Sequence, residues 1–423
     1  MKNPRIVIIG DGIAGLTAAR HIRRLNQNAK VTVIGAESVP LYSACALPDY
    51  LHGYQDRDGV FVPPFPELSK VKVIKNQIVD KIDREIQRVH MGDSYIDYDR
   101  LILATGSNAV VPPVPGAKIP GNFTLKTLGD VERIMDWGGH SAVVIGSGAI
   151  GVETSMALRA RGLRVTLIEM LDRIMPTAFD SAASQILQNS LEKHEINVLV
   201  NEKVLGVEGT EKVRGVMSTR GSIDCELIVW AAGVRPNTSL AQDAGIQIGN
   251  FRGIKVDDQM RTSDPRIFAC GDCIETWEQV LGKPALSLLW GSAKEQAEVA
   301  ARNALGMEKC YPGALGVMIE EIGGQLAVAT GYTESALVDI PHRVQEDQNN
   351  LGYYKVIYND EKILGFQMIG NTVGSGAVIS WIKKGANPKN ILEILNDPKS
   401  LQSAPWYGAA ARVFRKELSS LRG

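Results

Sequence analysis

A lone thiol, two glycine-rich turns and a few carboxylates are the residues of this chain best suited to chemistry. Cys45 lies in the run PLYSACALPDYL, just before a proline. A thiolate at such a position can be oxidised and reduced again. Free cysteine is also among the most buried residue types, so an inert packing role is the alternative. The role of Cys45 therefore depends on what the rest of the chain brings beside it.

The run PRIVIIGDGIAG predicts a turn that holds a phosphate. Gly10, Gly12 and Gly15 follow an apolar strand and precede the helical run LTAARHIRRL. In this order the first glycine permits a tight turn, the second lets the backbone approach a diphosphate, and the third lets the helix pack closely. The N–H groups that begin the helix face the anion. Strand, turn and helix together predict a dinucleotide-binding unit.

A second copy of the pattern lies in SAVVIGSGAIGVETSMALRARGLRVTLIEM. Gly146, Gly148 and Gly151 connect a strand to a helix that carries Glu153, and Glu169 ends the next strand. An acid at that distance accepts a hydrogen bond from a ribose 2′-hydroxyl and repels a 2′-phosphate. The second turn is therefore predicted to prefer NAD(H) over NADP(H), the alternative being a solvated strand-end carboxylate.

The first copy departs from the second at one position. Its second strand, KVTVIG, ends in Gly35 where the acid is expected, and the nearest carboxylate is that of Glu37. Either Glu37 reaches the ribose through a shifted loop, or backbone groups bind the ribose alone. Two dinucleotide sites in one chain suggest that NADH passes two electrons to a flavin, which can release them singly or together.

Length and composition indicate which class of protein positions these residues. At 423 residues the chain is longer than one core supports, so several domains are expected. With 44% hydrophobic residues, 22% charged residues and a net charge of -1, it has no field that would attract nucleic acid or anionic lipid. No apolar run approaches the ~18 residues of a spanning helix, and MKNPRIVIIG does not resemble a secretory signal. We expect a cytoplasmic protein that binds neither nucleic acid nor membrane.

The cysteines are too few and too scattered for a disulfide framework or a ferredoxin-type cluster. They are Cys45, Cys225, Cys270, Cys273 and Cys310. The sequence thus predicts no metal site, and a one-electron carrier would belong to a partner. The C-x-x-C formed by Cys270 and Cys273 is interpreted as packing rather than as a dithiol.

With these motifs the chain resembles the pyridine nucleotide-disulfide oxidoreductase superfamily, flavoproteins that bind FAD and NAD(P)H. The resemblance also rests on YDRLILATGSNAVVPPVPG, CELIVWAAGVRPNT and TSDPRIFACGDCIET, and it covers most of the chain. It implies an α/β fold with two Rossmann-like domains, for FAD and for NAD(H), and a C-terminal α+β interface domain. The implied ranges are 1–115 and 239–312 for the two parts of the FAD domain, 116–238 for the NAD(H) domain and 313–423 for the interface domain.

The resemblance also implies which residues contact the cofactors. Asp272 would hydrogen-bond the ribityl chain of FAD, and Glu153 would lie near the nicotinamide. The implied FAD-binding residues are Gly10, Gly12, Ala14, Gly15, Glu37, Ser43, Val79, Ala104, Thr105, Gly106, Gly271 and Asp272. The implied NAD-binding residues are Gly146, Gly148, Ile150, Gly151, Glu153, Glu169 and Gly233.

Cys45 resembles the single thiol of NADH oxidases and CoA-disulfide reductases, which lies against the flavin and cycles through a sulfenic acid or a mixed disulfide. Members of that branch that reduce CoA disulfides carry a tyrosine followed by Ala-Pro-Pro near the C-terminus. In LQSAPWYGAA, Ser403 stands at the tyrosine position. This departure favours a protein electron carrier as partner, as in rubredoxin and ferredoxin reductases. An iron-sulfur 2-oxoacid dehydrogenase complex, such as phenylglyoxylate dehydrogenase, is a related possibility in which this chain would be the FAD subunit.

Three functions follow from the resemblance. The favoured one is electron exchange between NAD(H), FAD and a redox protein or iron-sulfur partner. The second is an NADH oxidase or a CoA-disulfide or persulfide reductase that acts through Cys45. The third is a flavin-binding interaction protein that NADH switches. A homodimer or a subunit of a larger complex is expected in each case.

Overall fold

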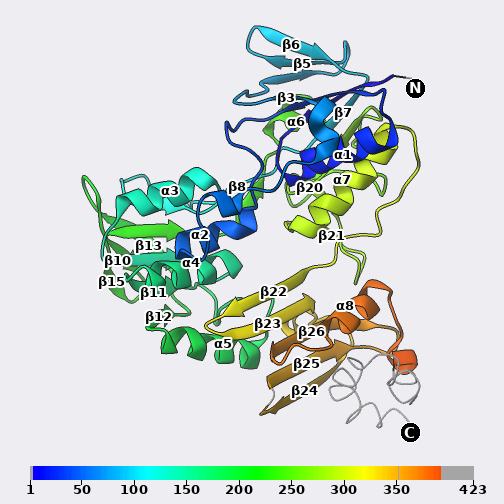
Figure 1. Cartoon of the computed structure of the whole chain (residues 1–423). Helices are drawn as coiled ribbons and strands as arrows, with labels where there is room; N and C mark the ends of the chain where they lie inside the picture. The colour runs from blue at the N-terminus through cyan, green and yellow to red at the C-terminus, as the bar shows by residue number, and fades with distance from the viewer. Residues whose placement is uncertain (1–2, 351, 392–423) are drawn as a thin grey trace.

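The structure is a computed structural model that describes residues 3–350 and 352–391. Its main sheets belong to three units, which Figure 1 shows at the top, at the left and at the bottom of the molecule. Two of the units are α/β and the third is built on an antiparallel sheet. This agrees with the expected fold class, whereas the predicted residue boundaries of the domains stay predictions.

The first unit contains a parallel sheet of five strands. Apolar runs such as RIVII are buried on both faces, as parallel sheets require. The order is β19 (Ile267–Ala269), β7 (Arg100–Leu103), β1 (Arg5–Ile9), β2 (Lys30–Ile34) and β3 (Lys72–Ile74). Helices α1 (Ile13–Leu25) and α7 (Trp290–Ala304) pack against each other beside it (Figure 1). Since β19 and α7 come late in the sequence, the chain leaves this unit and returns to it.

The second unit repeats this arrangement. Its parallel sheet has the order β12 (Ile196–Leu199), β11 (Arg164–Ile168), β10 (Ser141–Ile145), β16 (Leu227–Trp230) and β9 (Asn122–Thr124). Its helices are α3 (Leu128–Trp137), α4 (Ala149–Ala160) and α5 (Ser181–Lys193). The two sheets pair their central strands in the same register. Ile9 at the end of β1 pairs with Ile34 at the end of β2, and Ile145 at the end of β10 pairs with Ile168 at the end of β11.

A two-stranded ribbon connects the two α/β units. It pairs β8 (Ser107–Ala109) with β17 (Val234–Pro236) in antiparallel register. Thr105 and Asn237 reinforce it, since the Thr105 hydroxyl donates to the Asn237 carbonyl over 2.7 Å and the Asn237 amide donates back over 3.0 Å. The ribbon therefore links the two α/β units at the place where the chain passes from the first unit to the second and back.

Smaller elements surround these sheets, and one of them, α2, packs on the second unit. The helix α2 (Leu47–His52) lies within the range predicted for the FAD domain, yet Leu47 and Leu51 are buried against α4 of the second unit. The other small elements are β4 (Lys81–Asp83), β5 (Arg88–Met91), β6 (Ser94–Asp97), β13 (Val204–Gly209), β14 (Val213–Ser218), β15 (Gly221–Asp224), α6 (Ser239–Asp243), β18 (Ile254–Lys255), β20 (Ile274–Trp277) and β21 (Pro284–Leu286). Short 3₁₀ turns are η1 (Ala44–Ala46), η2 (Asp58–Val60), η3 (Pro66–Lys70) and η4 (Glu334–Ala336).

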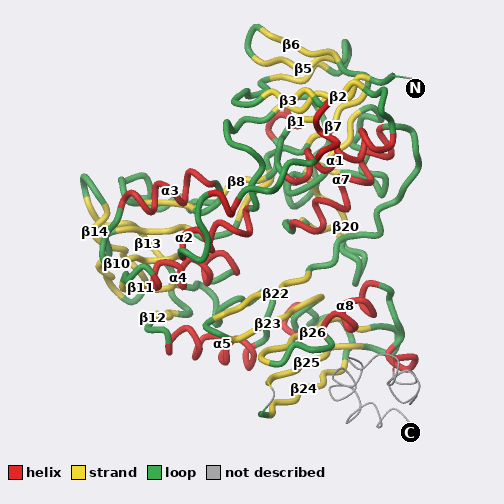
Figure 2. The backbone as a smooth tube through the Cα atoms, viewed as in Figure 1, coloured by secondary structure: helices red, strands yellow, loops and turns green. Residues whose placement is uncertain are grey.

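The third unit is an antiparallel sheet with one helix against it, as Figure 2 shows at the bottom of the molecule. The sheet has the order β22 (Val317–Ile322), β23 (Gln325–Gly331), β26 (Ile363–Gly370), β25 (Gly352–Tyr358) and β24 (Arg343–Asn349), and α8 (Ser375–Lys383) packs on it. Ser403, which stands where the resemblance would place a tyrosine, lies outside the described residues. Within residues 3–350 and 352–391, no helix has both the length and the apolar character needed to cross a membrane.

Candidate functional site

The first glycine turn has the geometry that a diphosphate requires. Gly10 has φ +108°, and a Cβ there would lie 2.0 Å from the Ala104 carbonyl oxygen. A Cβ on Gly15 would lie 1.9 Å from the Gly10 carbonyl oxygen, so helix and strand meet without room for a side chain. Gly12 faces open space, with nothing within 4 Å of its Cβ position. The expected roles of these glycines fit the structure.

The second glycine turn reproduces the first. A Cβ on Gly146 would lie 2.4 Å from the Ala231 carbonyl oxygen, and one on Gly151 would lie 1.8 Å from the Gly146 carbonyl oxygen, while Gly148 faces open space. Helices α1 and α4 begin at these turns without a side-chain cap and without an acid in the first turn. Their first N–H groups are thus available to an anion. The residues present at both turns fit a bound dinucleotide.

Glu169 lies where a ribose-binding acid is needed. It is 8% exposed at the end of β11. One carboxylate oxygen accepts from the Ser147 N–H over 2.9 Å and from its hydroxyl over 2.6 Å, and the other accepts from the Leu171 N–H over 2.9 Å. The carboxylate is therefore fixed over the second glycine turn. Its preference for NAD(H) stays a prediction.

The first turn holds its carboxylate in a different way. A Cβ on Gly35 would lie 2.1 Å from Cγ of Asp11, so the Asp11 carboxylate fills the space next to Gly35. The predicted Glu37 instead accepts a hydrogen bond from the Tyr42 hydroxyl, 3.0 Å from Oε2. Asp11 is not among the residues predicted from the sequence. Its signal is that Asp11 stands between two glycines, at the place that Ser147 takes in the second turn.

The Gly-Asp segment lies between the two α/β units. Gly271 has φ +82°, and its N–H donates to the buried Gln296 side chain of α7 over 2.9 Å. A Cβ on Gly271 would lie 2.9 Å from Cβ of Ala14 on α1. Asp272 accepts from the Ser107 hydroxyl over 2.8 Å. The segment thus lies beside the first glycine turn, as expected for a part of the FAD site.

The two cysteines that flank this segment are packing residues. Cys270 and Cys273 are both fully buried. Burial raises the pKa of both thiols, and the Cys273 thiol donates to the carbonyl oxygens of Cys270 and Leu103. A buried, protonated thiol is inert toward a partner in solution. The packing interpretation fits the structure.

Cys45 is exposed and lies in the 3₁₀ turn η1, directly before α2. Partial burial raises its pKa, and the charges of Glu153, Glu320 and Asp272 raise it further, while Lys126 lowers it. These neighbours come from α4, from β22, from the Gly-Asp segment and from the loop before α3. The structure therefore brings the predicted Cys45 and Glu153 together with the predicted Asp272.

Glu153 has a partner that the sequence analysis did not find. It is largely buried on α4, and it shares a hydrogen bond with Glu320 of β22. Burial first, and then the charge and hydrogen bond of Glu320, raise the pKa of Glu153 far above that of an ordinary carboxyl. Two adjacent carboxyl groups cannot both ionise freely, so the pair holds a proton at neutral pH. No sequence motif marks Glu320.

The remaining predicted residues lie in several parts of the two α/β units. Ser43 directly precedes η1, and its N–H donates to the Val60 carbonyl over 2.8 Å. Gly233 accepts from the Val110 N–H over 2.9 Å at the β8–β17 ribbon, close to Thr105 and Gly106. Ile150 is 37% exposed in the first turn of α4, and Val79 packs against the core of the first unit.

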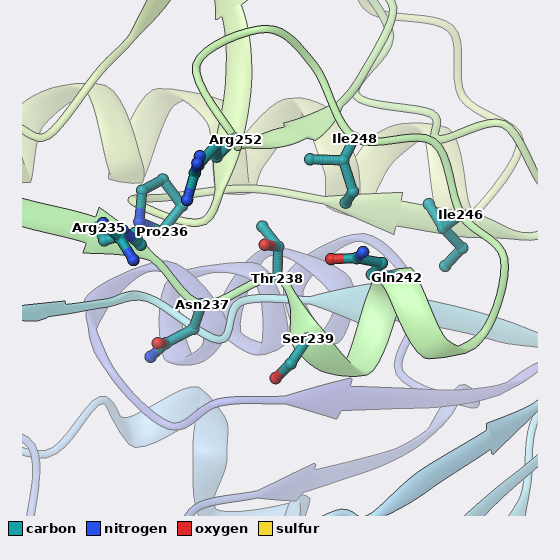
Figure 3. Close-up of a pocket in the computed structure, with 9 residues that line it drawn as sticks. All are labelled: Arg235, Pro236, Asn237, Thr238, Ser239, Gln242, Ile246, Ile248 and Arg252. Carbon is teal, nitrogen blue, oxygen red and sulfur yellow. The ribbon is translucent and has the colours of Figure 1, made fainter.

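A separate pocket of about 740 Å³ opens beside the ribbon (Figure 3). It contains none of the predicted site residues, although its Asn237 is hydrogen-bonded to Thr105. Its lining consists of Arg235, Pro236, Asn237, Thr238, Ser239, Gln242, Ile246, Ile248 and Arg252.

The chain is similar to several known proteins. A family model described as pyridine nucleotide-disulphide oxidoreductase matches residues 4–304. An NADH oxidase from Methanocaldococcus jannaschii is 33% identical over 86% of this chain and 87% of its own. Rhodocoxin reductase from Rhodococcus erythropolis is 34% identical over 78% of this chain and 79% of its own. The solved structure of an NAD-dependent persulfide reductase from A. fulgidus has a TM-score of 0.86 and 29% identity, and the match covers 92% of this chain and 78% of that one.

Proposed function

Since the chain belongs to the pyridine nucleotide-disulphide oxidoreductase family, we propose that it exchanges electrons between NAD(H) and a redox protein through bound FAD. The chain is an FAD-dependent oxidoreductase that uses a nicotinamide nucleotide. FAD, when bound, supplies an acceptor of two electrons that can release them singly or together. The protein's own residues bind and orient the two cofactors, with the two glycine turns as diphosphate sites and Asp272 beside the ribityl chain.

The environment of Cys45 carries the proposal. Disulfide chemistry requires a thiolate, which cationic neighbours or a helix N-terminus normally stabilise. Cys45 lies just before the short helix α2, but the carboxyl groups of Glu153, Glu320 and Asp272 are its charged neighbours. The cation near it, Lys126, already forms an ion pair with Asp272 over 3.2 Å. The raised pKa keeps the Cys45 thiol protonated at neutral pH. This environment does not favour a reactive thiolate, so it supports a route in which bound FAD would pass electrons to a partner rather than through this thiol.

The similarity to rhodocoxin reductase supports a protein partner. We propose a redox protein or an iron-sulfur subunit as this partner, and an iron-sulfur 2-oxoacid dehydrogenase complex of the phenylglyoxylate type is one form that it could take. A cytoplasmic location and a homodimer or larger complex are part of the same proposal.

A second candidate is reduction of a sulfur compound through Cys45. The exposure of Cys45 and its proximity to Glu153 and Asp272 favour it. In that reaction the Cys45 thiolate attacks a disulfide, one thiol leaves, and the electron pair of NADH reduces the resulting mixed disulfide. The sum is NADH, a proton and a disulfide giving NAD⁺ and two thiols. The names of the persulfide reductase and the NADH oxidase agree with this alternative.

Anaerobic titration with NADH separates the two functions when the protein is first treated with a small disulfide and freed of the excess, because only an oxidised Cys45 sulfur can take up electrons beyond those of the flavin. We expect the wild type to take up two electrons per subunit, because the flavin alone accepts them. Cys45→Ser should keep most of the rate of electron transfer to a one-electron acceptor, as should Cys310→Ser, which changes another exposed cysteine. Uptake of four electrons by the wild type and of two by Cys45→Ser would reject the proposal in favour of the second candidate. Slow reoxidation by every acceptor would instead indicate an NADH-switched interaction protein.

A further inference from the structure

The two glycine turns of this chain place equivalent residues in register. Gly10 and Gly146 follow β1 and β10, and their N–H groups donate to the last residues of β2 and β11 over 2.8 Å in both units. The position after β2 is Gly35, and the position after β11 is Glu169. The position between the first two glycines is Asp11 in one turn and Ser147 in the other.

The acid and the small residue have exchanged places between the two turns. In the second turn the Glu169 carboxylate extends from the strand end and accepts two hydrogen bonds from Ser147 in the loop. In the first turn the strand end has no side chain. The three carboxyl atoms of Asp11 lie 2.1, 2.2 and 2.3 Å from where a Cβ on Gly35 would be. Both units therefore hold a carboxylate beside the last residue of the second strand, supplied from opposite sides of the turn.

The Asp11 carboxylate is held in place by a cation. Lys75, which follows β3, donates to Oδ2 of Asp11 over 2.7 Å and to the Val39 carbonyl over 2.5 Å. The Asp11 side chain is 13% exposed. Among the described residues the hydrogen bonds to this carboxylate reach Oδ2, so Oδ1 is available to a ligand. The competing Glu37 is already hydrogen-bonded to Tyr42.

We propose that Asp11 is the residue that binds the adenosine ribose of FAD, in place of the acid missing at Gly35. Ribose hydroxyls donate hydrogen bonds, and an ionised carboxylate is their strongest protein acceptor. Lys75 acts as a positioning residue that holds the Asp11 carboxylate over Gly35. This inference rests on the proposed FAD site at the first glycine turn.

The test compares FAD with an FAD analogue whose adenosine carries a 2′,3′-dideoxyribose. Apoprotein is titrated with each flavin, and binding is followed by the change in flavin fluorescence. We expect the wild type to prefer FAD by about tenfold or more, the effect of losing a charge-assisted hydrogen bond. Asp11→Asn and Asp11→Ser should bind both flavins alike. A general loss of folding would weaken the binding of both flavins by the same factor. The ratio of the two dissociation constants would then stay as it is in the wild type.

A transplant of the second turn into the first supplies a stricter test. Gly35→Glu alone should weaken FAD binding, since its side chain collides with the Asp11 carboxylate and adds a like charge. The double variant Asp11→Ser with Gly35→Glu reproduces the Ser147 and Glu169 arrangement, and we expect it to regain the preference for FAD. Retained preference in Asp11→Asn, or its loss in Glu37→Gln, would overturn the inference. A wild type that binds no FAD would overturn the proposed function as well.

Discussion

At the scale of single residues, we predict that the carboxylate of Glu169 sets the choice of nicotinamide nucleotide. Its two oxygens are held by Ser147 and Leu171, so the negative charge has a fixed position beside the second glycine turn. A fixed charge there repels the 2′-phosphate of NADPH and accepts a hydrogen bond from the ribose of NADH. A loosely held side chain could move away from either group.

Glu169→Ser should therefore raise the ratio of kcat/KM for NADPH to kcat/KM for NADH by about tenfold or more, because the repulsion disappears. Steady-state kinetics with an artificial one-electron acceptor measure the ratio. Glu192→Ser, on the exposed side of α5, is the matched control and should leave the ratio unchanged. An unchanged ratio in Glu169→Ser would mean that the carboxylate does not face the ribose.

At the scale of elements, α4 and β22 meet through two carboxyl groups. Glu153 and Glu320 share a hydrogen bond, and the carboxylate of Asp49 on α2 and the thiol of Cys45 lie near them. The folded-state pKa of Glu153 is raised above its ordinary value of 4.5, with burial as the largest cause. The folded protein thus holds a proton that the unfolded chain releases above about pH 4.5.

The proton held by Glu153 and Glu320 makes the stability of the folded protein depend on pH. The contribution of this pair to stability is complete below the ordinary carboxyl pKa, and it is lost as pH rises toward the raised pKa of Glu153. Glu153→Gln keeps the hydrogen bond without a titrating proton. We expect it to reduce the loss of unfolding free energy between pH 5 and pH 8 by at least about 1 kcal/mol.

Urea denaturation at the two pH values measures this effect. Glu321→Gln removes an exposed carboxylate from the same strand, and it should leave the pH dependence as it is in the wild type. If Glu153→Gln and Glu321→Gln behaved alike, the pair would not share a proton in solution.

At the scale of the whole molecule, a buried ion pair joins the second unit to the third. Lys355 of β25 is 3% exposed. It lies 2.9 Å from Asp180, which precedes α5, and 2.8 Å from Glu334. Gln367 of β26 also donates to Asp180 over 2.8 Å. Lys355 is therefore a buried charged contact between these two units.

Lys355→Met should destabilise the protein by about 3–5 kcal/mol, because Asp180 would remain buried without its cation. Arg343→Met breaks an exposed pair with Asp360 in the same sheet and should cost less than about 1 kcal/mol. Chemical denaturation of both variants measures the difference. Equal losses in the two would show that Lys355 contributes no more than a surface pair.

The sequence by itself determined the local parts of this protein. Gly10, Gly12 and Gly15 could be assigned because strand, turn and helix are consecutive, and the strand and helix periods of the flanking residues are local properties. The same holds for the second turn and for Glu169, since one helix separates them. The segment with Gly271 and Asp272 was found by resemblance, and the structure puts it beside the first turn.

Only the tertiary structure decided which distant side chains meet. Glu320 reaches Glu153 because β22 packs against α4 from far along the chain. The acidic surroundings of Cys45 have the same origin. Such contacts join residues far apart in sequence, so their chemistry depends on how the units pack, and no spacing within the chain encodes it.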